Sequence, residues 1–375
     1  MFMHLSRHGY SDKSLQSRFN NMSTKYIFPS RLSSLSKLNR ILSGKDYKNS
    51  KFYIILDENT YNNCLPPLVS SVSALEKAEF FEVPTGENAK SLEVANQLWQ
   101  ALLESKSDRN SVIINLGGGC VCDLGGFVAA GFKRGIRYIN IPTTLIAMVD
   151  AAIGGKTAVN IGNEKNQVGF FHQPSVVCYD FNFLKTLPSD ELKNGLFELI
   201  KSFFLCGNTE VYELLKLSWN YDDASCYQDF IPHCVEFKRS IVNADPQEHS
   251  LRKILNFGHT FGHGIESHLR AHGHPVSHGY AVGIGMACEL YLSVKKLGMG
   301  EKLFADYCSF LRKLIQIPKF NLRDTESILS FMRHDKKNNG GLILCVLLQS
   351  IGVPLIDVAL DENEVRDALL HVCKC

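Results

Sequence analysis

The sequence has almost no excess of charge of either sign. Its 40 lysines and arginines nearly balance its 38 aspartates and glutamates, so the formal net charge is +2 over 375 residues. Proteins that bind nucleic acids or anionic membrane surfaces usually carry a broad basic excess. The composition therefore argues against both kinds of partner, and any functional group of cations must be local.

The chain also lacks an apolar run long enough to cross a bilayer, which takes roughly 20 residues. The longest apolar runs, such as INIPTTLIAMVDAAIGG, are shorter and are interrupted by polar residues. Residues 1–21 are polar and basic without an apolar core, so they do not resemble a secretory leader. We interpret them as a disordered extension or a start assigned too early, since Met22 begins a more regular stretch.

The twelve cysteines lack the pattern of a disulfide framework or of a zinc ribbon. They are scattered along a long chain, and the two C-x-C pairs, Cys120 with Cys122 and Cys373 with Cys375, have no second pair of the kind that a zinc ribbon needs. We expect buried thiols in a reducing, cytoplasmic compartment. The sequence has no internal repeat and no low-complexity tract either.

What the chain does contain is ample apolar sequence, 45% of its residues, for one large domain or two smaller ones. From Lys51 onward, strand patterns alternate with amphipathic helix patterns. The strand patterns are KFYIILDEN, EFFEVPTGENAK, SVIINLGGG and IRYINIP, and the helix patterns are SLEVANQLWQALLES and DLGGFVAAGF. This alternation predicts a parallel sheet of the nucleotide-binding, Rossmann-like type.

Near Phe183 the pattern changes to one that is almost wholly helical, with Pro188 as a helix start signal. We therefore place a domain boundary at 182–188. The predicted fold is an N-terminal α/β nucleotide-binding domain over residues 22–185, followed by a mainly α-helical C-terminal domain over residues 186–375.

Polar residues gather where the predicted strands end. Glycines 117–119 stand between a strand and a helix, where backbone N–H groups and the helix dipole favour a phosphate, although a tight turn without a ligand is the alternative. Thr143 and Thr144 follow the next strand, at the edge where α/β proteins bind ligands. Beyond them, lysines near glycines and an amide suit an anionic substrate, unless they are simply solvated: Lys156, Lys165 and Asn166.

The densest polar pattern is RKILNFGHTFGHGIESHLRAHGHPVSHGYAVGIGM, residues 252–286. Read as a helix, its first half aligns one cation, one amide and two imidazoles on one face: Arg252, Asn256, His259 and His263. Two imidazoles one turn apart suit a metal or an anion, although core histidines bonded to backbone carbonyls are the alternative. Gly258 and Gly262 leave a second face bare, so another helix or a ligand can approach the backbone closely.

A further polar pair stands inside the apolar segment LFELIKSFFL. Glu198 and Lys201 are spaced i, i+3 there, which places them on one face of a helix. A surface ion pair is the ordinary explanation of this spacing, but the apolar neighbours predict that the pair is buried.

Together these motifs resemble those of the 3-dehydroquinate synthase family, within the wider group of sugar phosphate cyclases. The resemblance covers roughly residues 51–353 and is highly specific, because many separate motifs occur in order: PTGENAKSL, GGGCVCDLGGFVAAGFKRG, PTTLIAMVDAAIGGKTAVN, KNQVGFFHQP, FLKTLP, FELIKS, LRKILNFGHTFGHGIE, SHGYAVGIGM and HDKKNNGG.

The resemblance implies three sets of site residues. A divalent metal, Zn²⁺ or else Co²⁺, would be held by Glu198, His259 and His278, with His274 as the alternative to His278. NAD would be contacted by Asp57, Glu87, Lys90, Gly118, Gly119, Asp123, Thr143, Thr144, Lys156, Lys165, Phe183 and Thr186. Substrate binding and catalysis are implied for Arg134, Asp150, Lys156, Lys165, Asn166, Lys201, Lys238, Arg252, Asn256, His263 and either Lys336 or Lys337.

The resemblance also implies a reaction. Family members convert 3-deoxy-D-arabino-heptulosonate 7-phosphate to 3-dehydroquinate and phosphate in the shikimate pathway, and they regenerate NAD in every turnover, so the expected class is a lyase. The carboxylate and phosphate of this substrate would explain local cations in a chain of little net charge. In the family, the arginine equivalent to Arg134 reaches the neighbouring subunit, which implies a homodimer.

One departure from the family pattern and three other functions remain open. Tyr280 stands where many members have a glutamate, so that role is absent or is supplied by a neighbour such as Glu266. A cyclase acting on sedoheptulose 7-phosphate could dispense with part of the cation set, all of which is present here. A metal-dependent polyol dehydrogenase would consume NAD, and a binding protein without activity would have lost metal ligands.

Overall fold

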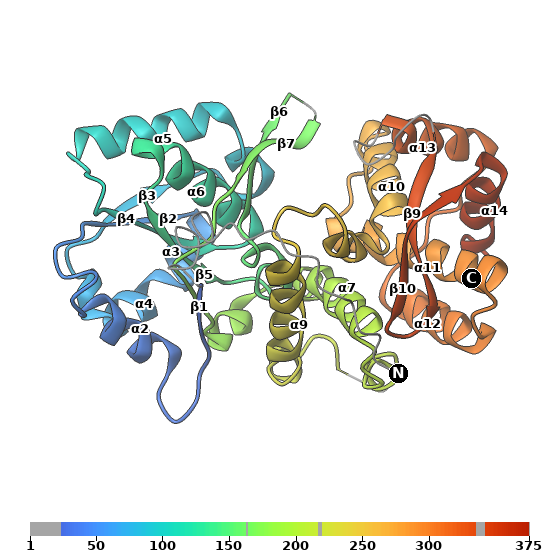
Figure 1. The fold of residues 1–375 in the computed structure, drawn as a ribbon, viewed down its shortest axis with the longest axis horizontal. Helices are drawn as coiled ribbons and strands as arrows, with labels where there is room; N and C mark the ends of the chain where they lie inside the picture. Colours follow the sequence, from blue (N-terminus) through green and yellow to red (C-terminus); the bar gives the residue numbers. More distant parts are fainter. Residues whose placement is uncertain (1–23, 163, 217–219, 335–341, 375) are drawn as a thin grey trace, which may run out of the picture.

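The computed structural model describes residues 24–162, 164–216, 220–334 and 342–374. The interpretations of residues 1–21 and of Lys336 and Lys337 therefore lie outside the described residues. Figure 1 shows an α/β half built around a sheet and, beside it, a half made mainly of helices. No helix in the described ranges is both long and apolar enough to cross a membrane.

A six-stranded sheet forms the centre of the α/β half, and every strand pair in it is parallel, in the order β1-β8-β5-β4-β2-β3. Its strands are β1 (Lys25–Ile27), β2 (Phe52–Leu56), β3 (Glu79–Glu82), β4 (Val112–Gly117), β5 (Arg137–Pro142) and β8 (Val176–Cys178). The predicted parallel sheet is confirmed. The strands β1 and β8 were not predicted, because three residues are too few to show a period.

Helices cover both faces of this sheet because the side chains of each strand alternate between the faces. In β2, Ile54 and Leu56 point to one face while Tyr53 and Ile55 point to the other, and all four are fully buried. The first face is covered by α2 (Ser34–Leu42) and α4 (Leu65–Ser71), and the second by α5 (Leu92–Glu104) and α6 (Gly119–Gly131), with α3 (Glu58–Asn63) following β2. The sheet is therefore the middle of three layers.

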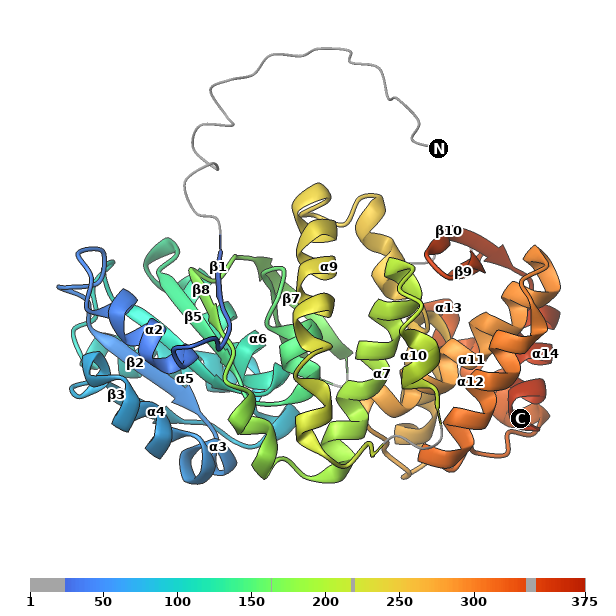
Figure 2. The ribbon, with the colours of Figure 1, turned by 90° about the horizontal axis from the view of Figure 1, so that it is seen from below.

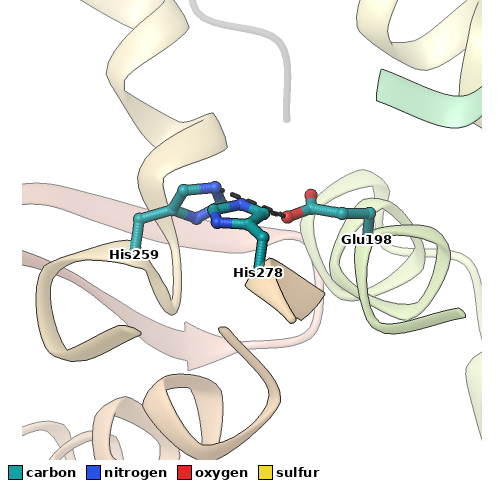
Figure 3. A group of neighbouring side chains, drawn as sticks. All are labelled: Glu198, His259 and His278. Carbon is teal, nitrogen blue, oxygen red and sulfur yellow. Dashed lines mark ion pairs between the residues drawn. The ribbon is translucent and has the colours of Figure 1, made fainter. Parts of the chain in front are cut away.

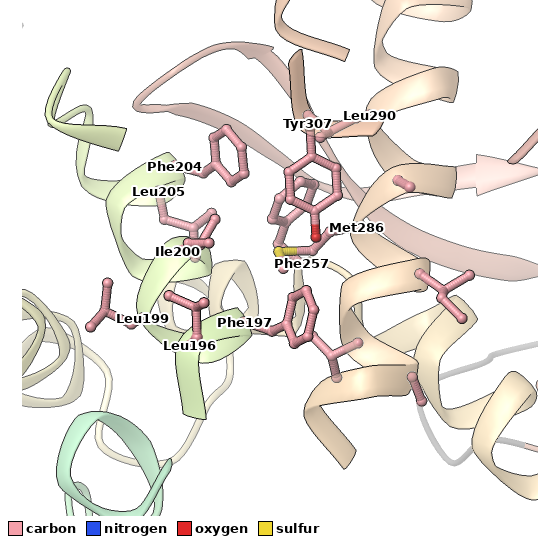
Figure 4. Packing of buried hydrophobic residues seen from close by; sticks show 14 of the residues in the cluster. Leu196, Phe197, Leu199, Ile200, Phe204, Leu205, Phe257, Met286, Leu290 and Tyr307 are labelled. Atoms are coloured by element: carbon pink, nitrogen blue, oxygen red, sulfur yellow. The ribbon is translucent and has the colours of Figure 1, made fainter. Parts of the chain in front are cut away.

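The helical half packs around a large apolar cluster, part of which Figure 4 shows. At its centre Phe204 contacts Phe257 and Tyr307 edge to face, with ring centres 6.1 and 5.7 Å apart. Its helices are α7 (Ser189–Cys206), α8 (Val211–Leu214), α9 (Ile231–Ala244), α10 (His259–Ala271), α11 (His278–Leu297), α12 (Glu301–Leu314), α13 (Leu322–His334) and α14 (Glu362–Val372). Figure 2 shows α7 and α9 between the sheet and the other helices.

Two antiparallel hairpins were not predicted. The first, of β6 (Lys156–Ile161) and β7 (Glu164–Phe171), extends from the α/β half. The second, of β9 (Ile343–Ser350) and β10 (Val353–Leu360), makes the C-terminal half mainly rather than wholly helical. The sequence of β9 is almost continuously apolar, and such a run does not distinguish a buried strand from a buried helix.

The prediction of one continuous helix across residues 252–263 is wrong. Leu251–Asn256 form a separate 3₁₀ turn, and α10 begins only at His259. Between them Gly258 has a φ of 80°, in the left-handed region, and its N–H donates to the buried carboxylate of Glu289 at 2.6 Å. Periodicity could not show this break, because the polar side chains on either side of it keep helical spacing.

The glycines do let another element approach the backbone, as predicted, and that element is α11. A Cβ on Gly262 would lie 3.1 Å from Val282 Cα, and a Cβ on Gly285 would lie 2.0 Å from the carbonyl oxygen of Gly258. The backbones of α10 and α11 are therefore in direct contact. This contact fixes two helices that both carry candidate site histidines.

Candidate active site

Three side chains from three helices meet in the helical half (Figure 3). Glu198 lies on α7, His259 begins α10 and His278 begins α11, and their ligand atoms lie within 4.8 Å of one another. A third imidazole, that of His263, has its ring centre 5.5 Å from that of His259. One carboxylate and two imidazoles form a ligand set for zinc or a similar metal that leaves positions open for a substrate. The exposed His274 is not part of this group.

Each of the two histidines is oriented by a contact at its other ring nitrogen. His259 Nδ1 lies 3.1 Å from the carbonyl oxygen of Phe257, and His278 Nδ1 lies 3.3 Å from Glu266 Oε2. An acceptor at Nδ1 requires the proton there, which leaves the Nε2 lone pair free to bind a metal. Both Nε2 atoms lie 3.4 Å from Oε1 of the same glutamate on α7. Tyr280, which stands where many family members have a glutamate, does not contact these histidines through its hydroxyl, which donates to the backbone carbonyl of Gln316 just after α12.

Glu198 has the environment of a metal ligand. It is 1% exposed, and neither carboxylate oxygen accepts a hydrogen bond of ordinary geometry from any described residue. Burial alone would raise its pKa, but Lys201, with Nζ 2.5 Å from Oε2, and His278 hold the pKa well below the ordinary value. Oε1, the buried oxygen that faces the two imidazoles, is therefore an atom whose coordination a bound cation would complete.

A largely buried series of alternating charges begins at Glu198, and only Asp150 in it is partly exposed, at 32% of its side chain. Lys201 lies 2.5 Å from Glu198 and 3.9 Å from Asp150. Lys238 continues the series by donating to Asp150 Oδ1 at 2.6 Å. A single turn of π-helix, Ala147–Ala151, presents Asp150, and such turns are frequent at functional sites. Burial raises the pKa of Asp150, but Lys238 and Lys201 outweigh it and hold the pKa at about 2.

A carboxylate that sequence analysis did not single out, that of Glu248, joins two of the predicted substrate residues. Its Oε1 accepts from Asn256 Nδ2 at 3.0 Å, and its Oε2 pairs with Lys156. Arg252 is 2% exposed and donates to two backbone carbonyls, one of them 98 residues away in the sequence. No local pattern could reveal Glu248, because its partner Lys156 is 92 residues away in the sequence. Glu248 also has a left-handed backbone, with a φ of 61°, which periodicity does not predict.

The carboxyl ends of β4 and β5 lie side by side, as the sequence predicted. Thr143 N–H donates to the carbonyl oxygen of Gly117 at 3.0 Å. Gly118 is the N-cap of α6, and a Cβ there would lie 3.0 Å from the methyl carbon of Thr144. The first N–H groups of α6 begin at Gly119, directly at this edge, so a helix N-terminus suited to a phosphate lies where a dinucleotide would bind.

Beside that edge, residues from three separate segments form one polar group. The Nζ of Lys90 lies 2.7 Å from Asp123 Oδ2 and donates to Asn166 Oδ1 at 2.6 Å. Lys165, the neighbour of Asn166 on β7, lies 3.5 Å from Glu87 Oε1. The structure thus brings together four positions assigned to NAD and one amide assigned to the substrate.

Four further predicted residues lie outside the polar groups described above, although Asp57, which directly follows β2, stands at the same carboxyl edge of the sheet as the end of β4. Arg134 ends a 3₁₀ turn at the opposite end of α6 from the glycine turn, in a left-handed conformation. Phe183 is buried in the core on one face of the sheet, and the hydroxyl of Thr186 donates to its carbonyl oxygen. Asp57 follows β2 and caps α3 by accepting from the N–H of Thr60. Their assignments remain predictions.

Comparison with known proteins gives the family. Residues 80–194 match the model for the 3-dehydroquinate synthase N-terminal region, and residues 195–338 match the model for the C-terminal region. The 3-dehydroquinate synthase of Parabacteroides distasonis is 38% identical over 336 residues, which are 90% of this chain and 93% of the relative.

Solved structures of two cyclases share the fold. A 2-deoxy-scyllo-inosose synthase, in complex with carbaglucose-6-phosphate, NAD⁺ and Co²⁺, has a TM-score of 0.76 at 22% identity, covering 93% of this chain and 96% of its own. The 2-epi-5-epi-valiolone synthase of Streptomyces hygroscopicus subsp. jinggangensis 5008, with NAD⁺ and Zn²⁺ bound, has a TM-score of 0.75 at 24% identity, covering 99% of both chains. By its two family matches and its full-length relative, the chain belongs to the 3-dehydroquinate synthase family.

Proposed function

We propose that this protein converts 3-deoxy-D-arabino-heptulosonate 7-phosphate to 3-dehydroquinate and phosphate, as a lyase that uses NAD and a divalent metal, Zn²⁺ or Co²⁺. The observation that carries the proposal is the group of Glu198, His259 and His278 beside the buried ammonium of Lys201 and the partly buried carboxylate of Asp150. Its Parabacteroides relative bears the name of this activity, and two cyclases of the same fold bind NAD⁺ with Co²⁺ or Zn²⁺.

The chain's own residues supply binding, orientation and proton transfer. The metal would polarise a substrate hydroxyl, and NAD would accept and return a hydride. Arg252 and Lys156 would bind the two anionic ends of the substrate, because charge-assisted hydrogen bonds to carboxylate and phosphate are strong. The ring of His263, 5.5 Å from His259 and 5.9 Å from His278, is placed to hold a proton beside the reacting centre.

Three further assignments belong to this proposal. The protein acts as a homodimer in which Arg134, at the end of the 3₁₀ turn that follows α6, serves a neighbouring copy, as the family resemblance implies. Residues 22–185 bind NAD, and residues 186–375 bind the metal and a phosphorylated sugar acid. The location is cytoplasmic, which is supported by the absence of any disulfide among the cysteines of the described residues.

Phosphate release from two substrates tests the proposal. Zinc-loaded protein with catalytic NAD should release phosphate from 3-deoxy-D-arabino-heptulosonate 7-phosphate, without net formation of NADH, and should not act on sedoheptulose 7-phosphate. Release from sedoheptulose 7-phosphate alone would assign the protein to a sister cyclase. Net NADH from simple polyols, with no phosphate released from either substrate, would make it a polyol dehydrogenase.

Arg252→Lys is expected to raise KM for the carboxylate-bearing substrate by more than about tenfold, because lysine keeps the charge but not the planar pair of donors. The KM for NAD should change by less than about twofold on the same reasoning. The matched control is Arg239→Lys, at a half-exposed arginine of α9 that pairs with Glu236 and should leave both constants unchanged. An equal rise in both constants for Arg252→Lys would show that the residue does not serve the substrate end of the site.

A further inference from the structure

Glu266 is a buried carboxylate whose contacts the reaction does not explain. It lies on α10, two turns after His259, and is 6% exposed. Its two oxygens face different partners. Oε2 lies 3.3 Å from His278 Nδ1, whereas Oε1 accepts from Lys165 Nζ at 2.7 Å and from Arg270 at 2.5 Å.

The first contact matters because His278 depends on a side chain for its orientation. The ring of His259 faces the carbonyl oxygen of Phe257, two residues earlier in the sequence. That oxygen belongs to the backbone, so no other side chain is needed to orient His259. His278 stands at the first position of α11, and its Nδ1 faces a side chain from another helix. The orientation of one of the three candidate ligands is therefore set by Glu266.

The second contact joins the two halves of the molecule. Lys165 belongs to β7, in the hairpin that extends from the α/β half, whereas Glu266 belongs to the helical half. Lys165 also lies 3.5 Å from Glu87, beside the edge of the sheet. A single carboxylate thus lies between a metal-site histidine and the hairpin that carries Lys156, Lys165 and Asn166.

We propose that Glu266 is a positioning residue that couples metal binding to the seating of the β6–β7 hairpin, through Oε2 on His278 and Oε1 on Lys165. The inference rests on the proposed function, because it requires that Glu198, His259 and His278 hold a divalent metal. A bound metal would hold His278 in place, and His278 would in turn hold the carboxylate of Glu266. Glu266 would then hold Lys165 and the hairpin to which it belongs. By linkage, a hairpin seated on that carboxylate must in turn strengthen metal binding by the same factor.

The first test is metal affinity, measured by competition with a chromophoric chelator for Zn²⁺ and by the visible absorption of Co²⁺. Glu266→Gln keeps the shape of the side chain but removes its charge, and it should weaken binding by about 10–100-fold and change the Co²⁺ spectrum. Arg270→Met, the matched control, removes the 40% exposed partner on the same helix and should change affinity by less than about twofold. Wild-type affinity in Glu266→Gln, or an equal loss in Arg270→Met, would overturn the proposal.

The second test is hydrogen exchange of the two hairpin strands, Lys156–Ile161 and Glu164–Phe171, with and without Zn²⁺. Zinc should slow exchange there in the wild type and in Arg270→Met, but not in Lys165→Met or Glu266→Gln. Lys165→Met leaves the contact with His278 in place, so it also decides the coupling if Glu266→Gln does not fold. Persisting zinc protection in Lys165→Met would overturn the coupling. Failure of the wild type to bind zinc at all would instead overturn the proposed function on which the inference rests.

Discussion

Replacement of Glu198 by glutamine is expected to lower kcat by more than about a thousandfold. Without the carboxylate ligand the site would lose its metal ion, which would otherwise stabilise the charge that develops on the substrate. Metal affinity should fall by more than about a hundredfold, since replacement of a residue that only orients a metal ligand can already lower the affinity by that much. Glutamine has nearly the same shape but no charge. The protein should remain folded, because Lys201 keeps Asp150 as a partner at 3.9 Å.

The chain offers a closely matched control for this substitution. Glu213 and Lys216 form an ion pair with the same spacing and the same 2.5 Å distance as Glu198 and Lys201, but their side chains are 63% and 58% exposed. Glu213→Gln should therefore leave kcat and metal content unchanged. Full activity of Glu198→Gln after treatment with a chelator would contradict the assignment of Glu198 to the metal.

The site illustrates which contacts a sequence can reveal. The burial of Glu198 and Lys201 follows from their spacing inside an apolar helix, and the structure confirms it, with 1% and 2% exposure. The place of His278 beside His259 follows from the motif, although 19 residues and a turn separate them. Both cases depend on local patterns or on motifs that keep their order along the chain.

Contacts between distant loops could not be predicted in this way. Periodicity suggested a single helix across residues 252–263, yet Gly258 breaks it, because its left-handed backbone is held by Glu289, 31 residues away. Glu248 acquires its role only when the hairpin brings Lys156 to it. The same is true of the contact between Glu266 and Lys165, which are 101 residues apart. These pairings depend on tertiary packing, which local sequence does not encode.

Lys201→Met is expected to have the largest effect on stability. Glu198 and Lys201 are almost fully buried, so removal of the lysine leaves a buried carboxylate without its nearest countercharge. The free energy of unfolding of the metal-free protein should fall by about 3–5 kcal/mol, as measured by urea denaturation. Lys216→Met breaks the exposed pair of the same geometry and should cost less than about 1 kcal/mol. Equal losses in the two variants would show that burial does not set the effect.

The pH dependence of this loss should identify the carboxylate as its cause. In the wild type the pKa of Glu198 is lowered, so its contribution to stability is present above the ordinary carboxyl pKa and is lost as the pH falls. Without Lys201, only His278 is left to oppose burial, so the pKa of Glu198 should be higher in the variant than in the wild type. The difference in stability between wild type and Lys201→Met should therefore shrink as the pH falls, and Glu198→Gln combined with Lys201→Met should restore much of it at neutral pH, because the double variant buries neither charge. Zinc should also recover part of the loss in Lys201→Met, since a cation at His259 and His278 would again face Glu198.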